Sequence, residues 1–217
     1  MSVRTKICGL STPETLAAAL RHGASHVGFI FFPKSPRNVD PDRAALLARQ
    51  LPSHVAAVGV FVDPAPDLLA QVLSRVPLQV VQLHGRERPA FAAEVRDIHG
   101  VELWKALPIR ARADLAAARD YVGAADRILY DAKTPEDADL PGGMGLRFDW
   151  KLLDRDTGGF VHPLPWLLSG GLDAGNVAEA VGITGADFVD VSSGVESAPG
   201  VKDVDKIAGF LQAVERL

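Results

Sequence analysis

The only cysteine of the chain, Cys8, lies in an apolar stretch at residues 6–10 that has the pattern of a short β-strand. Side chains alternate along a strand, so Lys6 and Cys8 share one face. A thiol beside a cation has the chemistry of a reactive thiolate, because a positive charge lowers the pKa of cysteine. A single cysteine is also a common buried apolar filler, and for Cys8 taken alone this alternative stays open.

A second candidate for chemistry is Asp131, which ends the apolar segment 127–131 and precedes a long loop at residues 132–146. An aspartate at a strand end also caps turns, so its residue type does not decide its role. The loop contains Gly142-Gly143-Met144-Gly145, a flexible run that suits either a lid over a ligand or a surface turn.

Two further residues could bind a ligand. His84 follows the apolar segment 78–83 and shares a strand face with Gln82; histidine titrates near neutral pH, but a lone histidine is more often structural. Arg37 lies in a loop after the segment 26–32, and its guanidinium could hold a carboxylate bidentately or remain on the surface.

Two glycine- and serine-bearing turns give the strongest physical signal. Ser169-Gly170-Gly171 runs toward Asp173, a predicted helix N-cap, and Asp190 is followed by Ser192-Ser193-Gly194. Such turns expose backbone N–H groups, and a following helix N-terminus adds positive partial charge. We therefore expect Gly170, Gly171, Ser192, Ser193 and Gly194 to bind a phosphate, although tight turns alone would use the same residues.

A regular repeat of an apolar strand followed by an alanine- and leucine-rich helix must position these residues. Near-continuous apolar strands alternating with helices indicate a parallel sheet covered by helices, and eight such units fit a (β/α)8 TIM barrel of the α/β class. A doubly wound sheet is the alternative, but no glycine-rich dinucleotide fingerprint follows the first strand. With no linker or composition break, one barrel domain is expected over residues 1–217. The expected strands cover 6–10, 26–32, 55–62, 78–83, 101–106, 127–131, 166–169 and 188–191, and the helices 12–21, 41–51, 63–75, 87–97, 112–121, 148–154, 173–181 and 204–214.

Composition narrows the class of protein. The 217 residues carry a net charge of −4 with both signs interspersed, which argues against a nucleic-acid-binding surface. One cysteine excludes an internal disulfide and a cysteine-based zinc site, and a lone thiol suits the reducing cytoplasm. No signal peptide and no membrane span are expected, so a cytoplasmic protein without membrane or nucleic-acid partners is predicted.

Taken together, the segments resemble the phosphoribosylanthranilate isomerase family of tryptophan biosynthesis. No single segment is decisive, but the ordered set is specific and spans nearly the whole chain. The matching segments are residues 6–9, 28–31 with 35–37, 60–62, 82–85, Asp131 with 142–143 and 148–150, 169–172 with 176–177, and 190–196 with 199–203.

The resemblance implies a TIM barrel without metal or organic cofactor that carries out an Amadori rearrangement of N-(5-phosphoribosyl)anthranilate to 1-(2-carboxyphenylamino)-1-deoxyribulose 5-phosphate. It implies Asp131 as general acid, with a raised pKa, and Cys8 as general base, with a pKa lowered by Lys6. It implies that Arg37 binds the anthranilate carboxylate, that His84 helps position the substrate and that Asp190 contacts a ribose hydroxyl.

One departure concerns the loop motif, which usually reads Gly-Gly-Thr-Gly; here Met144 replaces the threonine and removes a hydroxyl. Two alternatives remain: a non-catalytic sugar-phosphate-binding barrel, and a differently specific one, including a histidine-pathway-type isomerase. The latter family uses an aspartate where this chain has Cys8. The residue pattern is compatible with a monomer or a homodimer.

Overall fold

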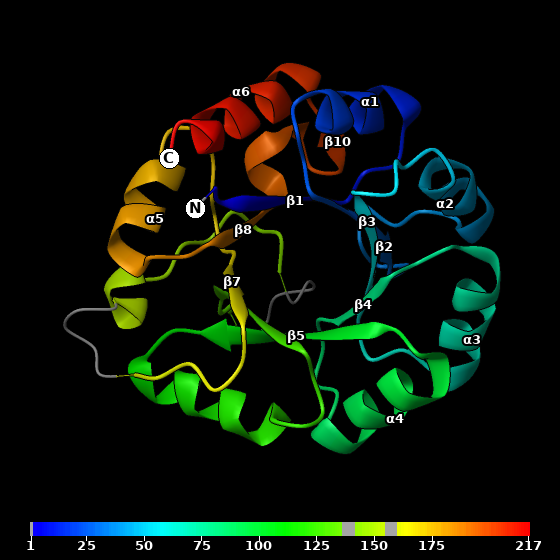
Figure 1. Cartoon of the computed structure of the whole chain (residues 1–217), viewed down its shortest axis with the longest axis horizontal. Coiled ribbons are helices and arrows are strands. Elements are labelled where there is room, and N and C mark those ends of the chain that lie inside the picture. Colours follow the sequence, from blue (N-terminus) through cyan, green and yellow to red (C-terminus); the bar gives the residue numbers. More distant parts are fainter. Residues whose placement is uncertain (1, 136–141, 155–159) are drawn as a thin grey trace.

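The computed structural model describes residues 2–135, 142–154 and 160–217, and its eight main strands close into a parallel barrel in sequence order. Figure 1 shows the helices as an outer ring around this sheet, which confirms the predicted TIM barrel. The last strand pairs with the first, with Lys6 opposite Asp190. The strands are β1 (Arg4–Cys8), β2 (His26–Phe31), β3 (Ala56–Phe61), β4 (Val80–Leu83), β5 (Glu102–Ile109), β6 (Arg127–Ala132), β7 (Trp166–Leu168) and β8 (Phe188–Val191).

Helix starts follow from capping residues and from proline, which is preorganised for the first helical position. The side chain of Thr12 accepts from the Thr15 N–H before α1, and Asp40 and Asp203 cap α2 and α6 in the same way. The helices are α1 (Pro13–Arg21), α2 (Pro41–Ala48), α3 (Pro66–Arg75), α4 (Pro89–His99), α5 (Val177–Thr184) and α6 (Val204–Glu215).

Four expected helices differ clearly from the structure. The third begins at Pro66 rather than residue 63, because Asp63 adopts a positive φ of 44° and its N–H donates to Glu87. The segments expected as the fifth and sixth helices form 3₁₀ helices, η1 (Arg112–Tyr121) and η2 (Trp150–Leu153). The N-cap of α5 is Asn176, not Asp173, which instead accepts from the Gly175 N–H within the preceding turn.

Alternation along the strands divides the core into two parts. One face of the sheet packs against the helices through residues such as Ile7 and Phe29. The other face fills the barrel and forms a separate cluster. Its members are Cys8, Val58, Val60, Val80, Trp104, Ala106, Leu129, Leu167 and Phe188. Cys8 is therefore an interior residue at the last position of β1.

The amino-terminal end of the barrel is closed by aromatic rings. The ring of His26 lies 5.3 Å from that of Trp104 and 4.8 Å from that of Phe188. The guanidinium of Arg4 lies 4.7 Å from the Phe188 ring, and that of Arg127 lies 5.5 Å from it. Rings and cations therefore fill the barrel interior at this end, and a second pocket beside them is lined in part by Arg4 and His26.

After β8 the chain forms a short 3₁₀ turn, η3 (Ser193–Val195), and a small antiparallel pair, β9 (Glu196–Ala198) with β10 (Val201–Lys202). This pair carries Glu196 and Lys202 back toward the mouth of the barrel. The longest described helix, α6, has 12 residues, and the described chain contains no apolar helix that could cross a bilayer.

Candidate active site

A pocket opens at the carboxyl ends of the strands and holds about 790 Å³ of empty space, part of it open to solvent. It collects all of the predicted site residues except Gly194, whose small size instead lets the chain pass close to the Leu172 carbonyl. Apolar side chains, among them Ile30, Val60 and the half-exposed Met144, line the same pocket. The predicted residues in the lining are Cys8, Arg37, His84, Asp131, Gly170, Gly171, Asp190, Ser192 and Ser193.

Cys8 lies beside a buried ion pair. Lys6 Nζ donates to Asp190 Oδ1 at 2.8 Å, and both side chains are almost wholly buried. Burial raises the pKa of the Cys8 thiol; Lys6 opposes this rise, and the Asp190 charge adds to it. The expectation that Lys6 produces a lowered pKa for Cys8 is therefore wrong in direction, because burial outweighs the ammonium and Asp190 engages that ammonium directly.

The same pair fixes the charge of Lys6. Burial lowers the pKa of Lys6, but Asp190 and Cys8 raise it to a net value above normal. Lys6 is consequently a permanent cation next to the thiol. The second oxygen of Asp190, Oδ2, accepts from the Ser169 hydroxyl at 3.4 Å and the residue still lines the pocket.

Asp131 ends a short chain of polar side chains that crosses from β4 to β6. Gln82 Nε2 lies 2.9 Å from His84 Nδ1, and His84 Nε2 lies 3.2 Å from Asp131 Oδ2. With the Gln82 amide donating to Nδ1, the proton of a neutral His84 resides on Nε2 and points at Asp131. Asp131 Oδ1 accepts from the Ala132 N–H at 2.8 Å. His84 thus holds the carboxyl in one orientation.

The loop motif lies directly over these groups. A Cβ atom on Gly142 would stand 2.7 Å from His84 Nε2 and 2.8 Å from Asp131 Oδ2, and one on Gly143 would stand 2.8 Å from Arg37 Nη1. The glycines therefore allow a close approach that any side chain would block. The predicted loop 132–146 also includes residues 136–141, which lie outside the described residues.

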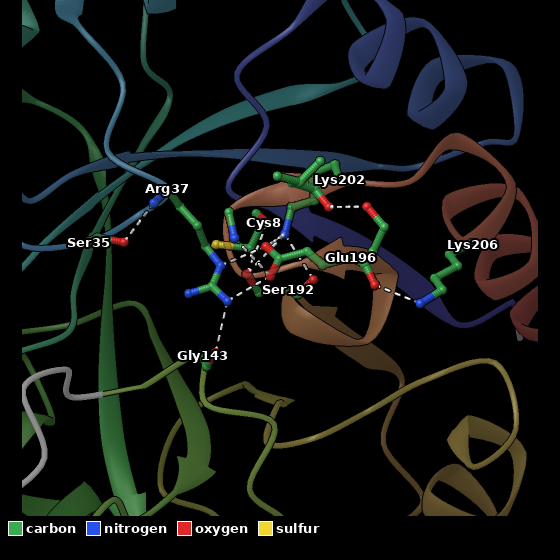
Figure 2. A network of polar contacts seen from close by, with 11 residues as sticks. Cys8, Ser35, Arg37, Gly143, Ser192, Glu196, Lys202 and Lys206 are labelled. Atoms are coloured by element: carbon green, nitrogen blue, oxygen red, sulfur yellow. Dashed lines mark hydrogen bonds and ion pairs between the residues drawn. The ribbon is translucent and has the colours of Figure 1, made fainter.

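Arg37 is buried and held from one side by a carboxylate. Its Nε and Nη2 donate to Glu196 Oε1 and Oε2 at 2.7 and 2.8 Å, and Nη2 also donates to the Gly143 carbonyl at 2.9 Å. Lys202 Nζ donates to the same Glu196 Oε1 at 2.7 Å and to the Ser192 carbonyl at 2.8 Å. Figure 2 shows this network around Cys8. The Nε–Nη2 edge of Arg37 is thus occupied by Glu196.

The turns after β7 and β8 offer backbone donors. Within the described part of the chain, the N–H groups of Gly170, Gly171, Ser193 and Gly194 have no acceptor. Gly170 and Gly171 have positive φ values of 90° and 65°, a conformation that glycine adopts without strain. Unpaired N–H groups on these two turns are suited to bind an anion.

Three of these residues had no role assigned by sequence reasoning: Gln82, Glu196 and Lys202. Gln82 is a polar residue in an otherwise aliphatic strand, on the same strand face as His84 and within the matched segment 82–85, and these were its signals. Glu196 and Lys202 lie in the matched segments, but the contact between Glu196 and Arg37 joins residues 159 positions apart and has no local pattern.

A parallel eight-stranded barrel with free backbone donors after β7 and β8 and with a thiol, an imidazole and a carboxyl group in its pocket is typical of enzymes that convert phosphorylated substrates. The comparisons specify the family. Residues 5–213 match the family model described as N-(5'-phosphoribosyl)anthranilate (PRA) isomerase. The chain belongs to this family, and it is an isomerase that acts on N-(5-phosphoribosyl)anthranilate in tryptophan biosynthesis.

Relatives and solved structures agree over the full length. An N-(5'-phosphoribosyl)anthranilate isomerase from Zymomonas mobilis subsp. mobilis is 59% identical over 218 residues, covering 100% of both chains. The crystal structure of the Thermotoga maritima enzyme matches with a TM-score of 0.85 and 37% identity, covering 99% of this chain and 100% of that one. A complex with reduced 1-(o-carboxyphenylamino)-1-deoxyribulose 5-phosphate matches with a TM-score of 0.82 and 35% identity, over the same shares.

Proposed function

We propose that Asp131 is the general acid and Cys8 the general base of the isomerisation. The observation that carries this assignment is that both side chains line one pocket together with Arg37 and the unpaired N–H groups after β7 and β8. Asp131 donates its proton to the ribose ring oxygen; the C1–O bond breaks, and the nitrogen lone pair forms a protonated Schiff base. Cys8 then removes the proton from C2, and the C–H electrons form an enolamine that tautomerises to the ketone.

The raised pKa of Cys8 places a requirement on this mechanism, because the thiol must lose its own proton before it can accept the one on C2. A buried thiol gives up its proton more readily when a positive charge forms beside it. Opening of the ribose ring creates such a charge on the Schiff-base nitrogen, and Lys6 supplies a second one from within the barrel. These charges thus favour the thiolate, the form of Cys8 that can accept the C2 proton.

We further assign substrate contacts. Arg37 binds the anthranilate carboxylate through Nη1, the nitrogen that Glu196 leaves unused, and Gly170, Gly171, Ser192, Ser193 and Gly194 bind the 5-phosphate. His84 orients Asp131 and the substrate beside it, and Asp190 accepts from a ribose hydroxyl while holding Lys6. These assignments are supported by the lining of the pocket and by the directions of the hydrogen bonds described above.

We infer a cytoplasmic enzyme whose partner is its small phosphorylated substrate, without a metal or organic cofactor. The catalytic and binding residues assigned here come from one chain and from one barrel domain over residues 1–217, so the site is complete in a monomer and in each half of a homodimer. Size-exclusion chromatography with light scattering distinguishes these two states.

The roles are tested by following the fluorescence of freshly made phosphoribosylanthranilate with purified protein. We expect turnover by the native chain and a loss of about 10²–10⁴-fold in kcat for Cys8→Ala with unchanged thermal unfolding. Near-native kcat in Cys8→Ala would remove the thiol from the mechanism. Absence of turnover by the native protein would contradict the whole assignment.

A further inference from the structure

The network around Arg37 contains more charge than a simple carboxylate clamp requires. Glu196 takes two of the five guanidinium N–H groups, and the Gly143 carbonyl takes a third. Within the described residues, the two N–H groups of Nη1 have no acceptor, and Arg37 lines the pocket. The guanidinium is therefore locked by one edge so that its remaining end faces the ligand.

A glutamate as the only partner of Arg37 would weaken the attraction of this arginine for a substrate carboxylate. An arginine paired with one glutamate has no net charge, and its attraction for a substrate carboxylate in a buried site would be weak. Here Lys202 is bound to the same glutamate, at 2.7 Å from Oε1, and its side chain is as buried as that of Glu196. With all three side chains ionised, Arg37, Glu196 and Lys202 together carry a net charge of +1.

The ionisation of Glu196 supports this count. Burial raises its pKa, but the hydrogen bonds and charges of Arg37 and Lys202 lower it to a net value below normal. Burial lowers the pKa of Lys202 to a net value below normal, although the charge and hydrogen bond of Glu196 oppose that shift. The carboxylate is thus ionised at neutral pH and shared by two cations.

We propose that Glu196 and Lys202 are positioning and specificity-determining residues for the anthranilate carboxylate. Glu196 fixes the direction of Arg37, and Lys202 restores the positive charge that Glu196 would otherwise cancel. This inference rests on the proposed role of Arg37 in binding that carboxylate, and it adds that the selectivity for a carboxylated ring depends on two residues that do not bind the substrate.

Lys202 also connects the two ends of the site. Its Nζ donates to the Ser192 carbonyl at 2.8 Å and lies 3.2 Å from the Ser192 hydroxyl, which in turn donates to the Cys8 carbonyl at 3.2 Å. One ammonium thus supports the carboxylate clamp, the phosphate-binding turn and the backbone of the proposed base. A change at Lys202 therefore affects phosphate binding as well, whereas a change at Glu196 acts mainly through Arg37.

The test compares two ligands by calorimetry: reduced 1-(o-carboxyphenylamino)-1-deoxyribulose 5-phosphate and its counterpart with an unsubstituted phenyl ring. The measured quantity is the ratio of their Kd values. Glu196→Gln removes the charge and one acceptor at nearly constant size. We expect the carboxylated ligand to bind about tenfold more weakly, or worse, with little change for the unsubstituted one. Lys202→Met is expected to weaken both ligands, and the carboxylated one more.

Arg37→Met tests the role of Arg37 in carboxylate binding separately from the supporting roles of Glu196 and Lys202. If Arg37 is the clamp, this variant loses the preference for the carboxylated ligand, and adding Glu196→Gln has no further effect on the ratio. A retained preference in Arg37→Met contradicts the role of Arg37. A preference lost in Arg37→Met but kept in both Glu196→Gln and Lys202→Met overturns the supporting role and leaves the clamp intact.

A matched control is available in the same mouth. Glu87 forms a similarly buried ion pair with Lys105 at 3.0 Å and has no contact with Arg37. Glu87→Gln loses a buried charge as Glu196→Gln does, so it reports the general cost of such a loss. We expect the Kd ratio of the two ligands to stay unchanged in Glu87→Gln. If Glu196→Gln fails to fold, Lys202→Met carries the test alone: an unchanged ratio there contradicts the proposal.

Discussion

Cations are buried or half-buried at both ends of the barrel, but they are balanced in different ways. At the mouth, Lys6 and Arg37 each contact a buried carboxylate at 2.7–2.8 Å. At the amino-terminal end, Arg4 and Arg127 lie over aromatic rings, and their carboxylate partners, Asp187 and Glu102, are largely exposed. Buried ion pairs thus lie at the end of the barrel that holds the proposed site. At the opposite end the cations pack over apolar rings instead.

This contrast predicts that changes at the mouth affect turnover first and that changes at the other end affect stability first. The largest expected effect is that of Asp131→Asn, which removes the proposed acid while keeping its shape. We expect kcat to fall by about 10²–10⁴-fold with the unfolding midpoint nearly constant. Asp187→Asn, an exposed carboxylate at the opposite end, is the control and should retain native kcat. Loss of kcat in the control would break the contrast.

The second prediction concerns the ion pair beneath the thiol. Lys6→Met leaves Asp190 buried without its cation, so the free energy of unfolding in urea should fall by about 3–5 kcal/mol. Removal of the ammonium also raises the pKa of Cys8 further, so alkylation by iodoacetamide at a fixed pH becomes slower. Lys105→Met breaks a comparable pair away from the thiol; it should lower stability similarly without changing the alkylation rate. Equal alkylation rates in both variants would contradict the role of Lys6.

The third prediction addresses the aromatic end. Trp104→Phe removes part of a fully buried ring and its Nε1 hydrogen bond to Glu102. We expect a loss of about 1–2 kcal/mol in unfolding free energy, with kcat and KM close to native. A fall in kcat larger than the loss in folded protein would show that the two ends are not independent.

The last prediction is a pH dependence at the same end, which has little effect on stability at neutral pH. Burial, together with the positive charges of Lys6, Arg4 and Arg127, lowers the pKa of His26 from 6.5 to about 4. Between these values the unfolded chain binds a proton that the folded protein does not, so stability falls as pH decreases from about 6.5 toward 4. His26→Phe keeps a ring and removes this proton, so its acid destabilisation should be smaller. His54→Phe, an exposed position, serves as the control and should follow the native pH profile.

The barrel was readable from the sequence because parallel strands buried on both faces are almost continuously apolar. At least one exception arose from a distant contact. Asp63 was expected to begin a helix, but its N–H donates to Glu87, 24 positions away, and the helix starts at Pro66. The segment Arg112–Tyr121 has a helical composition but forms a 3₁₀ helix.

The candidate site also has a part that could be predicted from the sequence and a part that could not. Cys8, His84 and Asp131 could be predicted because a barrel brings its strand ends together, so that each strand end is a candidate. The contacts that the side chains of the site make with one another could not be predicted. Lys6 bonds to Asp190 across 184 positions, and this partner redirects the ammonium that was expected to lower the pKa of the thiol. Which cation meets which carboxylate depends on the closed barrel and on the loop after β8.

The isolated position of Cys8 has a consequence for oxidation. Peroxides attack thiolates far faster than thiols, and burial keeps this sulfur in its protonated form at neutral pH. The sequence contains no second cysteine, so a sulfenic acid at Cys8 could not be resolved as a disulfide within the chain. A high pKa therefore protects the proposed base between turnovers, when oxidative damage to it would have no internal repair.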